Sequence, residues 1–352
     1  MQDYYSSLKI FHHKDRLDAL KADKPTIPIH VHLIPTNRCN QNCNFCAYRK
    51  EGYSSKSTFD AREQIPTKKL LSLVDDFAEI GVKAVELTGG GEPTVHPGFV
   101  DLCNALKANS IDYGVVTNGI NQSPSITDAL AKASWVRFSR DSATPETYSR
   151  IRCVPKHQYY ASRRHTKTVL KVCGPNTIVG VGFVVTKHNW IETALAIAQA
   201  KEDGADNIRI SAVFQSEGVS YFDDFASKVI SQLNYAKRKY EDEKFRIFDL
   251  FSDRLQDLEQ QSPDYDTCHI QKLMTYIGAD QNVYRCCVTA YNSLGLLGSI
   301  KGQSFKRFWQ DPTTVEKLRS FNAKQCPLCM FNGKNATIDY ALADDPGHVN
   351  FL

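Results

Sequence analysis

Three closely spaced cysteines are the first residues in this sequence that could do chemistry. Cys39, Cys43 and Cys46 form a Cys-x3-Cys-x2-Cys motif directly after an apolar run at residues 30–36. Three thiolates at this spacing can bind one face of a cubane iron–sulfur cluster. Such a cluster usually takes four cysteines, so one iron would stay open for a non-protein ligand. A zinc knuckle is the alternative, but zinc usually takes four ligands in paired Cys-x2-Cys units. The motif therefore favours iron.

Cysteine usage in the whole chain also points to metal rather than to disulfides. The sequence has 352 residues and 11 cysteines, and disulfide frameworks belong to small secreted domains. In a reducing compartment, clustered cysteines more often bind metal or take part in catalysis. A second group lies near the C-terminus and consists of Cys268, Cys286, Cys287, Cys326 and Cys329.

Composition excludes several classes of protein. The formal net charge is +4, with 42% apolar and 23% charged residues, as in an ordinary soluble globular protein. This charge balance does not indicate a nucleic-acid partner. No apolar run is long enough to span a membrane, and the N-terminal segment lacks the apolar region of a secretory signal. We therefore expect a cytoplasmic protein.

The elements that must position the cysteines follow a repeating pattern. Short apolar runs predict strands at 30–36, 83–88, 112–117, 134–140, 178–186 and 207–213. Helix-length amphipathic stretches separate them, at 67–80, 98–108, 125–132, 157–172 and 190–203. Six βα units predict an α/β fold with a parallel sheet. A partial (β/α)6 TIM-type barrel is favoured, and a doubly wound sheet is the alternative.

The pattern divides the chain into four expected parts. An N-terminal extension (1–29) precedes the barrel (30–218). A connecting helical segment (219–265) contains the run FRIFDLF, which could add a strand. A small C-terminal domain (266–352) contains the run MTYIGADQNVYRC, which predicts a hairpin that turns near residues 279–282.

Motifs at the ends of successive predicted strands carry a family resemblance. After the cysteine motif come Thr-Gly-Gly-Gly-Glu-Pro at 88–93, Thr-Asn-Gly at 117–119 and Ser-Arg-Asp at 139–141. In this order they resemble the radical S-adenosylmethionine (AdoMet) superfamily over residues 30–213. The resemblance implies a [4Fe–4S] cluster on Cys39, Cys43 and Cys46, whose open iron chelates AdoMet. It also implies reductive cleavage of AdoMet to a 5′-deoxyadenosyl radical, which takes a hydrogen atom from a substrate.

The resemblance also assigns residues to AdoMet. Glu92 falls in the Gly-Gly-Glu motif that holds the AdoMet amino group in the family, and Arg152 matches an arginine that pairs with the AdoMet carboxylate. Arg140 departs from the Ser-Leu-Asp sequence that relatives often show. The implied AdoMet-binding set is Phe45, Tyr48, Gly90, Gly91, Glu92, Thr117, Asn118, Ser139 and Arg152.

The C-terminal cysteines resemble the ligands of a Twitch domain, the short form of the SPASM extension. The resemblance implies one auxiliary [4Fe–4S] cluster, fully ligated by Cys268, Cys286, Cys326 and Cys329. Cys287 competes for the second position, and the Val-Tyr-x-Cys pattern favours Cys286. A four-cysteine zinc site is the alternative, because Cys-Pro-Leu-Cys is equally half of a zinc knuckle.

Strand alternation predicts which side chains face the interior of the barrel. Glu86 and Arg137 are candidate substrate contacts, with His32, Ser139 and Arg209 on the same inner face. A packed barrel core normally uses branched apolar residues, so this polar interior favours a polar, including an anionic, substrate. Alternatively, these groups bind only AdoMet or pair with one another.

Cys153 directly follows Arg152 and is a candidate hydrogen donor, since some radical epimerases quench the substrate radical with a thiol; a plain buried cysteine is the alternative.

The expected function is a radical AdoMet oxidoreductase. An auxiliary cluster could accept the electron left on the substrate radical, which favours a net two-electron oxidation of a small polar substrate. Peptide modification, redox-neutral epimerisation or rearrangement, and a non-catalytic metal-binding role are the alternatives. Because only 38 residues precede Cys39, we expect no leader-peptide module, which favours a small molecule. A reducing partner such as flavodoxin or ferredoxin is implied, and no membrane partner.

Overall fold

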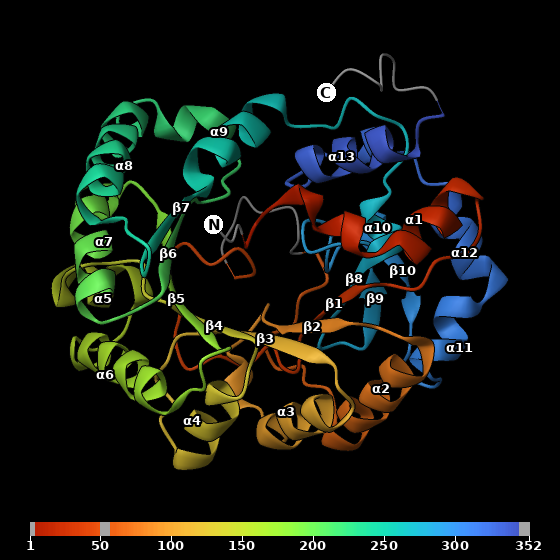
Figure 1. Ribbon diagram of the computed structural model, residues 1–352, viewed down its shortest axis with the longest axis horizontal. Helices are drawn as coiled ribbons and strands as arrows, with labels where there is room; N and C mark the ends of the chain where they lie inside the picture. Colours follow the sequence, from red (N-terminus) through yellow and green to blue (C-terminus); the bar gives the residue numbers. More distant parts are fainter. Residues whose placement is uncertain (1–3, 50–56, 345–352) are drawn as a thin grey trace.

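A curved sheet of ten strands forms the centre of the protein (Figure 1). The computed structural model describes residues 4–49 and 57–344. The order across the sheet is β10-β9-β8-β1-β2-β3-β4-β5-β6-β7. Strands β1 to β8 pair in parallel, whereas β9 and β10 pair antiparallel. The expected partial (β/α)6 barrel is therefore confirmed.

The six predicted strands all form, within one to three residues of their expected ends. They are β1 (His30–Leu33), β2 (Ala84–Leu87), β3 (Asp112–Thr117), β4 (Trp135–Ser139), β5 (Ile178–Val185) and β6 (Asn207–Ala212). The helices between them are α2 (Thr67–Ile80), α3 (Phe99–Ala108), α4 (Pro124–Ala131), α6 (His157–Val172) and α7 (Thr193–Glu202).

One helix of this region, α5 (Pro145–Arg152), is not among the predicted elements. It follows the local rules for a helix start, because the Thr144 side chain accepts a hydrogen bond from the backbone N–H of Thr147 and Pro145 occupies the first turn. The helix ends at Cys153, whose backbone adopts a left-handed conformation with φ of 53°. This short helix places Arg152 against the first cysteine motif.

Segments outside the six βα units extend the same sheet. The FRIFDLF run supplies β7 (Arg246–Asp249), which pairs with β6 between α8 (Ala226–Tyr240) and α9 (Leu250–Gln260). The predicted hairpin forms from β8 (Met274–Ile277) and β9 (Asn282–Tyr284), and β10 (Leu296–Ser299) adds to it. Because β8 pairs with β1, the C-terminal cysteines are tied to the barrel edge where the first cysteine motif begins. The remaining helices are α10 (Ile270–Leu273), α11 (Phe305–Gln310), α12 (Pro312–Arg319) and α13 (Asn332–Leu342).

Apolar side chains on the outer face of the sheet pack against the surrounding helices. Val136 and Phe138 of β4, and Ile208 and Ile210 of β6, are fully buried in two apolar clusters between strands and helices. Their neighbours in sequence therefore point to the interior of the barrel, as strand alternation predicts. No helix in the described part of the chain is long and apolar enough to cross a membrane.

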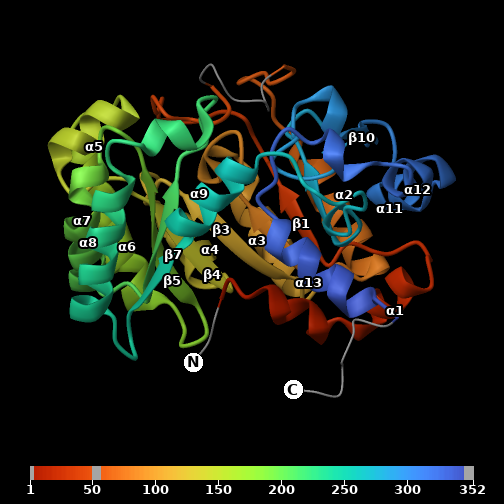
Figure 2. The same ribbon diagram turned by 90° about the horizontal axis from the view of Figure 1, so that it is seen from above.

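The N-terminal segment lies across the open side of the barrel. η1 (Ser7–His12) and α1 (Lys14–Lys21) lie beside α13 in both views (Figures 1 and 2). The Tyr5 ring lies 4.8 Å from that of Phe248 in β7, and the Thr337 hydroxyl donates to Ser7 Oγ at 3.0 Å. Residues 4–9 therefore reach from β7 to α13 and help to enclose the interior.

Candidate functional site: two cysteine sets beside one cavity

The first cysteine motif occupies the loop after β1, and α5 holds that loop in place. The backbone N–H of Asn44 donates to the Ile151 carbonyl at 2.8 Å, and the Gln41 side chain donates to the Tyr148 hydroxyl at 2.9 Å. All three thiols are free and half-buried. Burial raises the pKa of Cys43 to about 12, and the other two thiols lie within electrostatic range of it. Three convergent free thiols fit one face of an iron–sulfur cluster.

The glycine motif after β2 packs directly under this loop. A Cβ atom at Gly91 would lie 2.2 Å from the Arg38 carbonyl oxygen, and one at Gly90 would lie 2.3 Å from Asn37 Oδ1. Only glycine permits this approach, because the contacts at Gly91 are with backbone atoms.

Glu92 is buried beside the glycine motif and joins three strand ends. Its carboxylate accepts hydrogen bonds from the Thr117 hydroxyl and the Asn118 backbone N–H, both at 2.7 Å, and from Thr94. The Asn118 side chain in turn donates to Asn40 Oδ1 at 2.6 Å, next to Cys39. The structure thus brings these expected AdoMet residues together beside the first cysteine motif.

Arg152 is buried against the same cysteine motif. Its guanidinium forms an ion pair with Asp141, donates to Gln41 Oε1 at 2.6 Å, and lies 4.0 Å from Cys43 Sγ. Burial opposes ionisation of this side chain, but Asp141 and Cys43 outweigh burial and raise the pKa of Arg152. A permanent positive charge therefore stands beside the first cysteine motif.

Arg140, the departure from the family pattern, has a structural role on the helix side of β4. Its guanidinium donates to Asp203 Oδ2 at 2.8 Å and to the Thr166 hydroxyl, and both charged side chains are almost fully buried. Arg163 and Lys167 also pair with Asp203. Arg140 is thus directed away from the barrel interior.

The second cysteine set converges from three segments near β8 and β9. Cys268 precedes α10, Cys286 follows β9, and Cys326 and Cys329 lie in the irregular segment between α12 and α13. An isolated bridge between Thr267 and Asn322 joins the first and last of these segments. The four thiols lie within electrostatic range of one another.

Several polar groups surround this second set. The Arg285 guanidinium lies beside three of the thiols, and burial lowers its pKa to about 10. The Tyr265 hydroxyl contacts Cys329 Sγ at 3.2 Å, and the Phe331 backbone N–H donates to the same sulfur at 3.3 Å. Four free thiols with these partners fit a fully ligated cluster.

Cys287 differs from the other four C-terminal cysteines because it lines a large cavity inside the barrel, which they do not. Its thiol lies 3.6 Å from Met330 Sδ. Burial raises its pKa, and it lies within electrostatic range of Glu86 as well as of Cys286. Sequence reasoning treated Cys287 only as a rival ligand and missed its place in the cavity, because Cys286 and Cys287 lie beyond the end of β9, where strand alternation gives no guidance.

The cavity has a volume of about 1970 Å3 and runs the length of the barrel. Its lining includes the first residues of three strands, Trp135, Ile178 and Asn207, and also Thr88 and Tyr48 near the carboxyl ends. The two cysteine sets both adjoin it. Tyr48, two residues after Cys46, lines one part, whereas Tyr265, Cys287 and Met330 line the part beside the second set.

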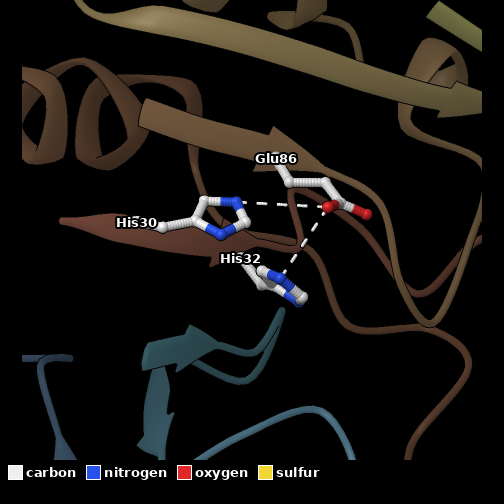
Figure 3. Close-up of side chains that lie close together, drawn as sticks. All are labelled: His30, His32 and Glu86. Atoms are coloured by element: carbon white, nitrogen blue, oxygen red, sulfur yellow. Dashed lines mark ion pairs between the residues drawn. The ribbon is translucent and has the colours of Figure 1, made fainter. Parts of the chain in front are cut away.

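A polar cluster from β1 and β2 projects into the cavity. Figure 3 shows His30 and His32 facing Glu86, with imidazole Nε2 atoms 4.0 Å and 3.7 Å from Glu86 Oε2. They meet because His32 and Glu86 are register partners in the sheet. Arg137 Nη2 lies 3.9 Å from the other carboxylate oxygen.

The charges in this cluster follow from burial and from its neighbours. Burial lowers the pKa of His30 to about 3, with a contribution from His32, and burial also lowers the pKa of His32. Burial alone would raise the pKa of Glu86, but the two histidines and Arg137 outweigh it and lower that pKa. At neutral pH the cluster therefore has neutral imidazoles and an ionised carboxylate.

Some of the expected residues lie elsewhere. Cys153 is exposed, its thiol is directed to the Arg150 carbonyl, and it is not among the residues that line the cavity, so the structure does not bring it together with Glu86 and Arg137. Phe45 packs against the apolar cluster around β5 and β6. Ser139 is half-buried at the end of β4 and does not line the cavity. His30 was missed, although its position two residues before His32 on one strand face could have revealed it.

Comparisons with known proteins agree with this geometry. Residues 33–197 match the model of the Radical SAM superfamily, and residues 268–330 match the SPASM model, an iron-sulfur cluster-binding domain. The barrel with its cysteine motif and strand-end residues therefore places the chain in the radical SAM superfamily. Within it, the chain is a radical SAM enzyme with a C-terminal auxiliary-cluster domain. The cofactors of these two domains are AdoMet and [4Fe–4S] clusters.

The curated relatives are matched over only part of their length. A probable GTP 3',8-cyclase of Thermococcus kodakarensis is 32% identical over 130 residues, which is 36% of this chain and 39% of that protein. The GTP 3',8-cyclase of Pseudomonas syringae is 25% identical over 62% of this chain and 60% of its own length. The mycofactocin maturase MftC of Mycobacterium tuberculosis is 32% identical over 33% of this chain and 28% of its own.

A solved structure shares the fold. Streptococcus suis SuiB bound to S-adenosylmethionine has a TM-score of 0.64 and 15% identity, and the match covers 91% of this chain and 75% of that chain.

Proposed function

We propose that this enzyme oxidises a polar substrate in the barrel cavity by two electrons, with AdoMet as co-substrate and the auxiliary cluster as electron acceptor. The bound cluster and AdoMet would supply a 5′-deoxyadenosyl radical, which removes one hydrogen atom from a substrate carbon. The observation that carries the proposal is that both cysteine sets adjoin one cavity. A substrate there would lie between the radical source and a site for the second electron.

The residues near the first cysteine motif would bind and orient AdoMet. In this proposal Cys39, Cys43 and Cys46 hold the radical-generating cluster. Glu92 accepts the AdoMet amino group, and Arg152 pairs with its carboxylate; a charge-assisted hydrogen bond of this kind is worth about 1.5–3 kcal/mol. Tyr48 contacts the adenine, and Gly90, Gly91, Thr117 and Asn118 complete the binding site.

The residues of the cavity would bind the substrate and take up the one proton that it releases. Glu86 and Arg137 are the proposed substrate contacts. Glu86 is ionised, so its carboxylate can accept a proton as the electron leaves the substrate. At the part of the cavity beside the second cysteine set, Cys268, Cys286, Cys326 and Cys329 hold the auxiliary cluster. In total the substrate loses one hydrogen atom to the adenosyl radical, one electron to the auxiliary cluster and one proton to the Glu86 carboxylate.

The experiment uses the reduced holoenzyme, AdoMet and a low-molecular-mass extract of the producing cells in heavy water. We expect a product two hydrogens lighter than its substrate, formed one-to-one with 5′-deoxyadenosine. The double variant Cys326→Ala/Cys329→Ala should still cleave AdoMet but form no such product, provided iron analysis and circular dichroism show an intact barrel. A product of unchanged composition that carries one solvent deuterium would overturn the oxidation and indicate epimerisation.

A peptide is the second candidate substrate, and the size of the cavity favours it. Small-molecule pockets usually measure about 300–1,000 Å3, whereas this cavity measures about 1970 Å3. One SuiB structure contains a bound precursor peptide, and MftC is named a maturase. Running the same assay on a peptide fraction distinguishes the two classes, because only one fraction should yield the lighter product.

A further inference from the structure

Two arginines face each other across a strand that has no side chains between them. Arg137 of β4 is the register partner of Gly180 in β5, and Arg209 of β6 is the register partner of Gly182 in the same strand. A Cβ atom at Gly182 would lie 3.4 Å from Arg137 Cδ. Gly182 therefore forms a floor beside the Arg137 side chain, which a larger residue would fill, whereas the Asn207 side chain covers Gly180.

These arginines have few partners within the described chain. Arg137 pairs with Glu86 at 3.9 Å, which is long for a charge-assisted hydrogen bond, and its guanidinium lies 5.4 Å from the Trp135 ring centroid. Arg209 Nε is buried and has no hydrogen-bond partner among the described residues, and its guanidinium lies 5.5 Å from the Tyr5 ring centroid. A buried donor without an acceptor is costly unless a ligand supplies one.

The charges nearby are also unbalanced. Lys334 of α13 lines the same cavity and lies within electrostatic range of Arg209 and Glu86. Arg137, Arg209 and Lys334 thus all lie within electrostatic range of one carboxylate, Glu86. Two further cations lie near them: Lys9 near Lys334, and Arg254, which pairs with Asp257, near Arg209. Burial and the charge of Arg137 lower the pKa of Arg209 to about 10.

This excess charge decides between two ligands for the cavity. His30, His32 and Glu86 place their ligand atoms within 4.8 Å of one another, a donor set that could hold a divalent cation. Arg137 already pairs with that carboxylate, and two further cations lie nearby, so a divalent cation would add repulsion. An anion would instead relieve it.

We propose that Arg137 and Arg209, with Lys334, bind an oxyanion of the substrate, a carboxylate or a phosphate, over the glycine floor of β5. The inference rests on the proposed function, because it assigns the class of substrate that the same cavity holds. Planar guanidinium groups suit both oxyanions, since each can present two parallel donors. The oxyanion would fix one end of the substrate and direct the rest towards the AdoMet site.

The test measures binding rather than turnover, so its outcome does not depend on the oxidation. Calorimetry on the anaerobic holoenzyme with AdoMet would use inorganic phosphate, pyrophosphate and succinate, at constant ionic strength. We expect at least one of them to bind. Arg209→Gln and Arg137→Gln should each weaken that binding by about 10- to 150-fold, the range for a lost charge-assisted hydrogen bond.

Two further variants are controls: they test whether a loss of binding comes from misfolding or from a general loss of positive charge in the cavity. Gly182→Val keeps every charge but fills the floor, so it should also abolish binding. Arg246→Gln is the matched control, because Arg246 lines the same cavity but pairs with Glu241 at 3.1 Å; it should bind like the wild type. Iron content and circular dichroism confirm that each variant is folded.

Preference for phosphate or for succinate would identify the oxyanion. The proposal is overturned if no probe binds, if Gly182→Val and Arg209→Gln bind like the wild type, or if Arg246→Gln weakens binding equally. Zinc or iron(II) bound beyond the cluster iron, and lost in His30→Gln, would overturn it in favour of a cation site.

Discussion

Replacing Cys286 and Cys287 separately should distinguish a cluster ligand from a cavity residue. The Cys286 thiol lies with those of Cys268, Cys326 and Cys329, whereas Cys287 faces Met330 and the cavity. Two four-iron clusters give about eight iron and eight sulfide per chain after anaerobic reconstitution. Cys286→Ala should therefore retain about four of each, because the iron that loses its thiolate in the second cluster has no AdoMet to take the place of the missing ligand, unlike the open iron of the first cluster.

Cys287→Ala is the matched control, with the same chemical change one residue away. It should keep about eight iron and eight sulfide per chain, and its Mössbauer spectrum in the reduced state should show both clusters. Iron and sulfide analysis, with Mössbauer spectroscopy, measures both variants. Loss of four iron from Cys287→Ala but not from Cys286→Ala would refute this assignment of the thiols. One zinc in place of the second iron set would refute the auxiliary cluster itself.

Three further variants test other parts of the structure. Arg152→Ala should weaken AdoMet binding and also lower thermal stability, by about 3–5 kcal/mol, because it leaves Asp141 buried without its ion pair; unchanged AdoMet affinity in equilibrium dialysis would remove Arg152 from the site. Burial raises the pKa of Asp203, but Arg140 and Arg163 outweigh burial and hold that pKa below its ordinary value. The ionised carboxylate therefore stabilises the folded protein fully above the unfolded-state pKa of about 3.9, and this stabilisation is lost as pH falls through the lower folded-state pKa. Denaturant unfolding should thus show Asp203→Asn less stable at neutral pH by about 3–5 kcal/mol, with a gap that narrows in acid; a constant gap would contradict the ion pairing. Gly91→Ala should displace the first cysteine loop and cost about four of the eight iron, whereas Gly302→Ala, which has open space around its Cα, should cost none.

The sequence predicted the barrel well because its signals are local. Each strand of β1 to β6 is a short apolar run, and strand alternation correctly placed Arg137 and Arg209 inside and Phe138 outside. Alternation does not extend past the end of β1 at Leu33: the Thr36 hydroxyl donates to the Glu63 carbonyl, and Thr36 does not line the cavity.

The cavity could not be read from the sequence because it depends on contacts between distant segments. The meeting of His30, His32 and Glu86 depends on the register of β1 and β2, which no local pattern specifies. Lys334 reaches the interior only because α13 packs beside η1 and α1 at the open side of the barrel. Arg140 could be recognised as a departure, but its buried partner Asp203 lies 63 residues away.

Cleavage of AdoMet by the reduced holoenzyme tests the central claim most directly. The wild-type protein should release 5′-deoxyadenosine and methionine in equal amounts. The variant with Cys39, Cys43 and Cys46 replaced by alanine should release neither, while it keeps the iron of the second set, about four per chain. Cleavage by this triple variant, or none by wild-type protein that carries its full iron, would contradict the account.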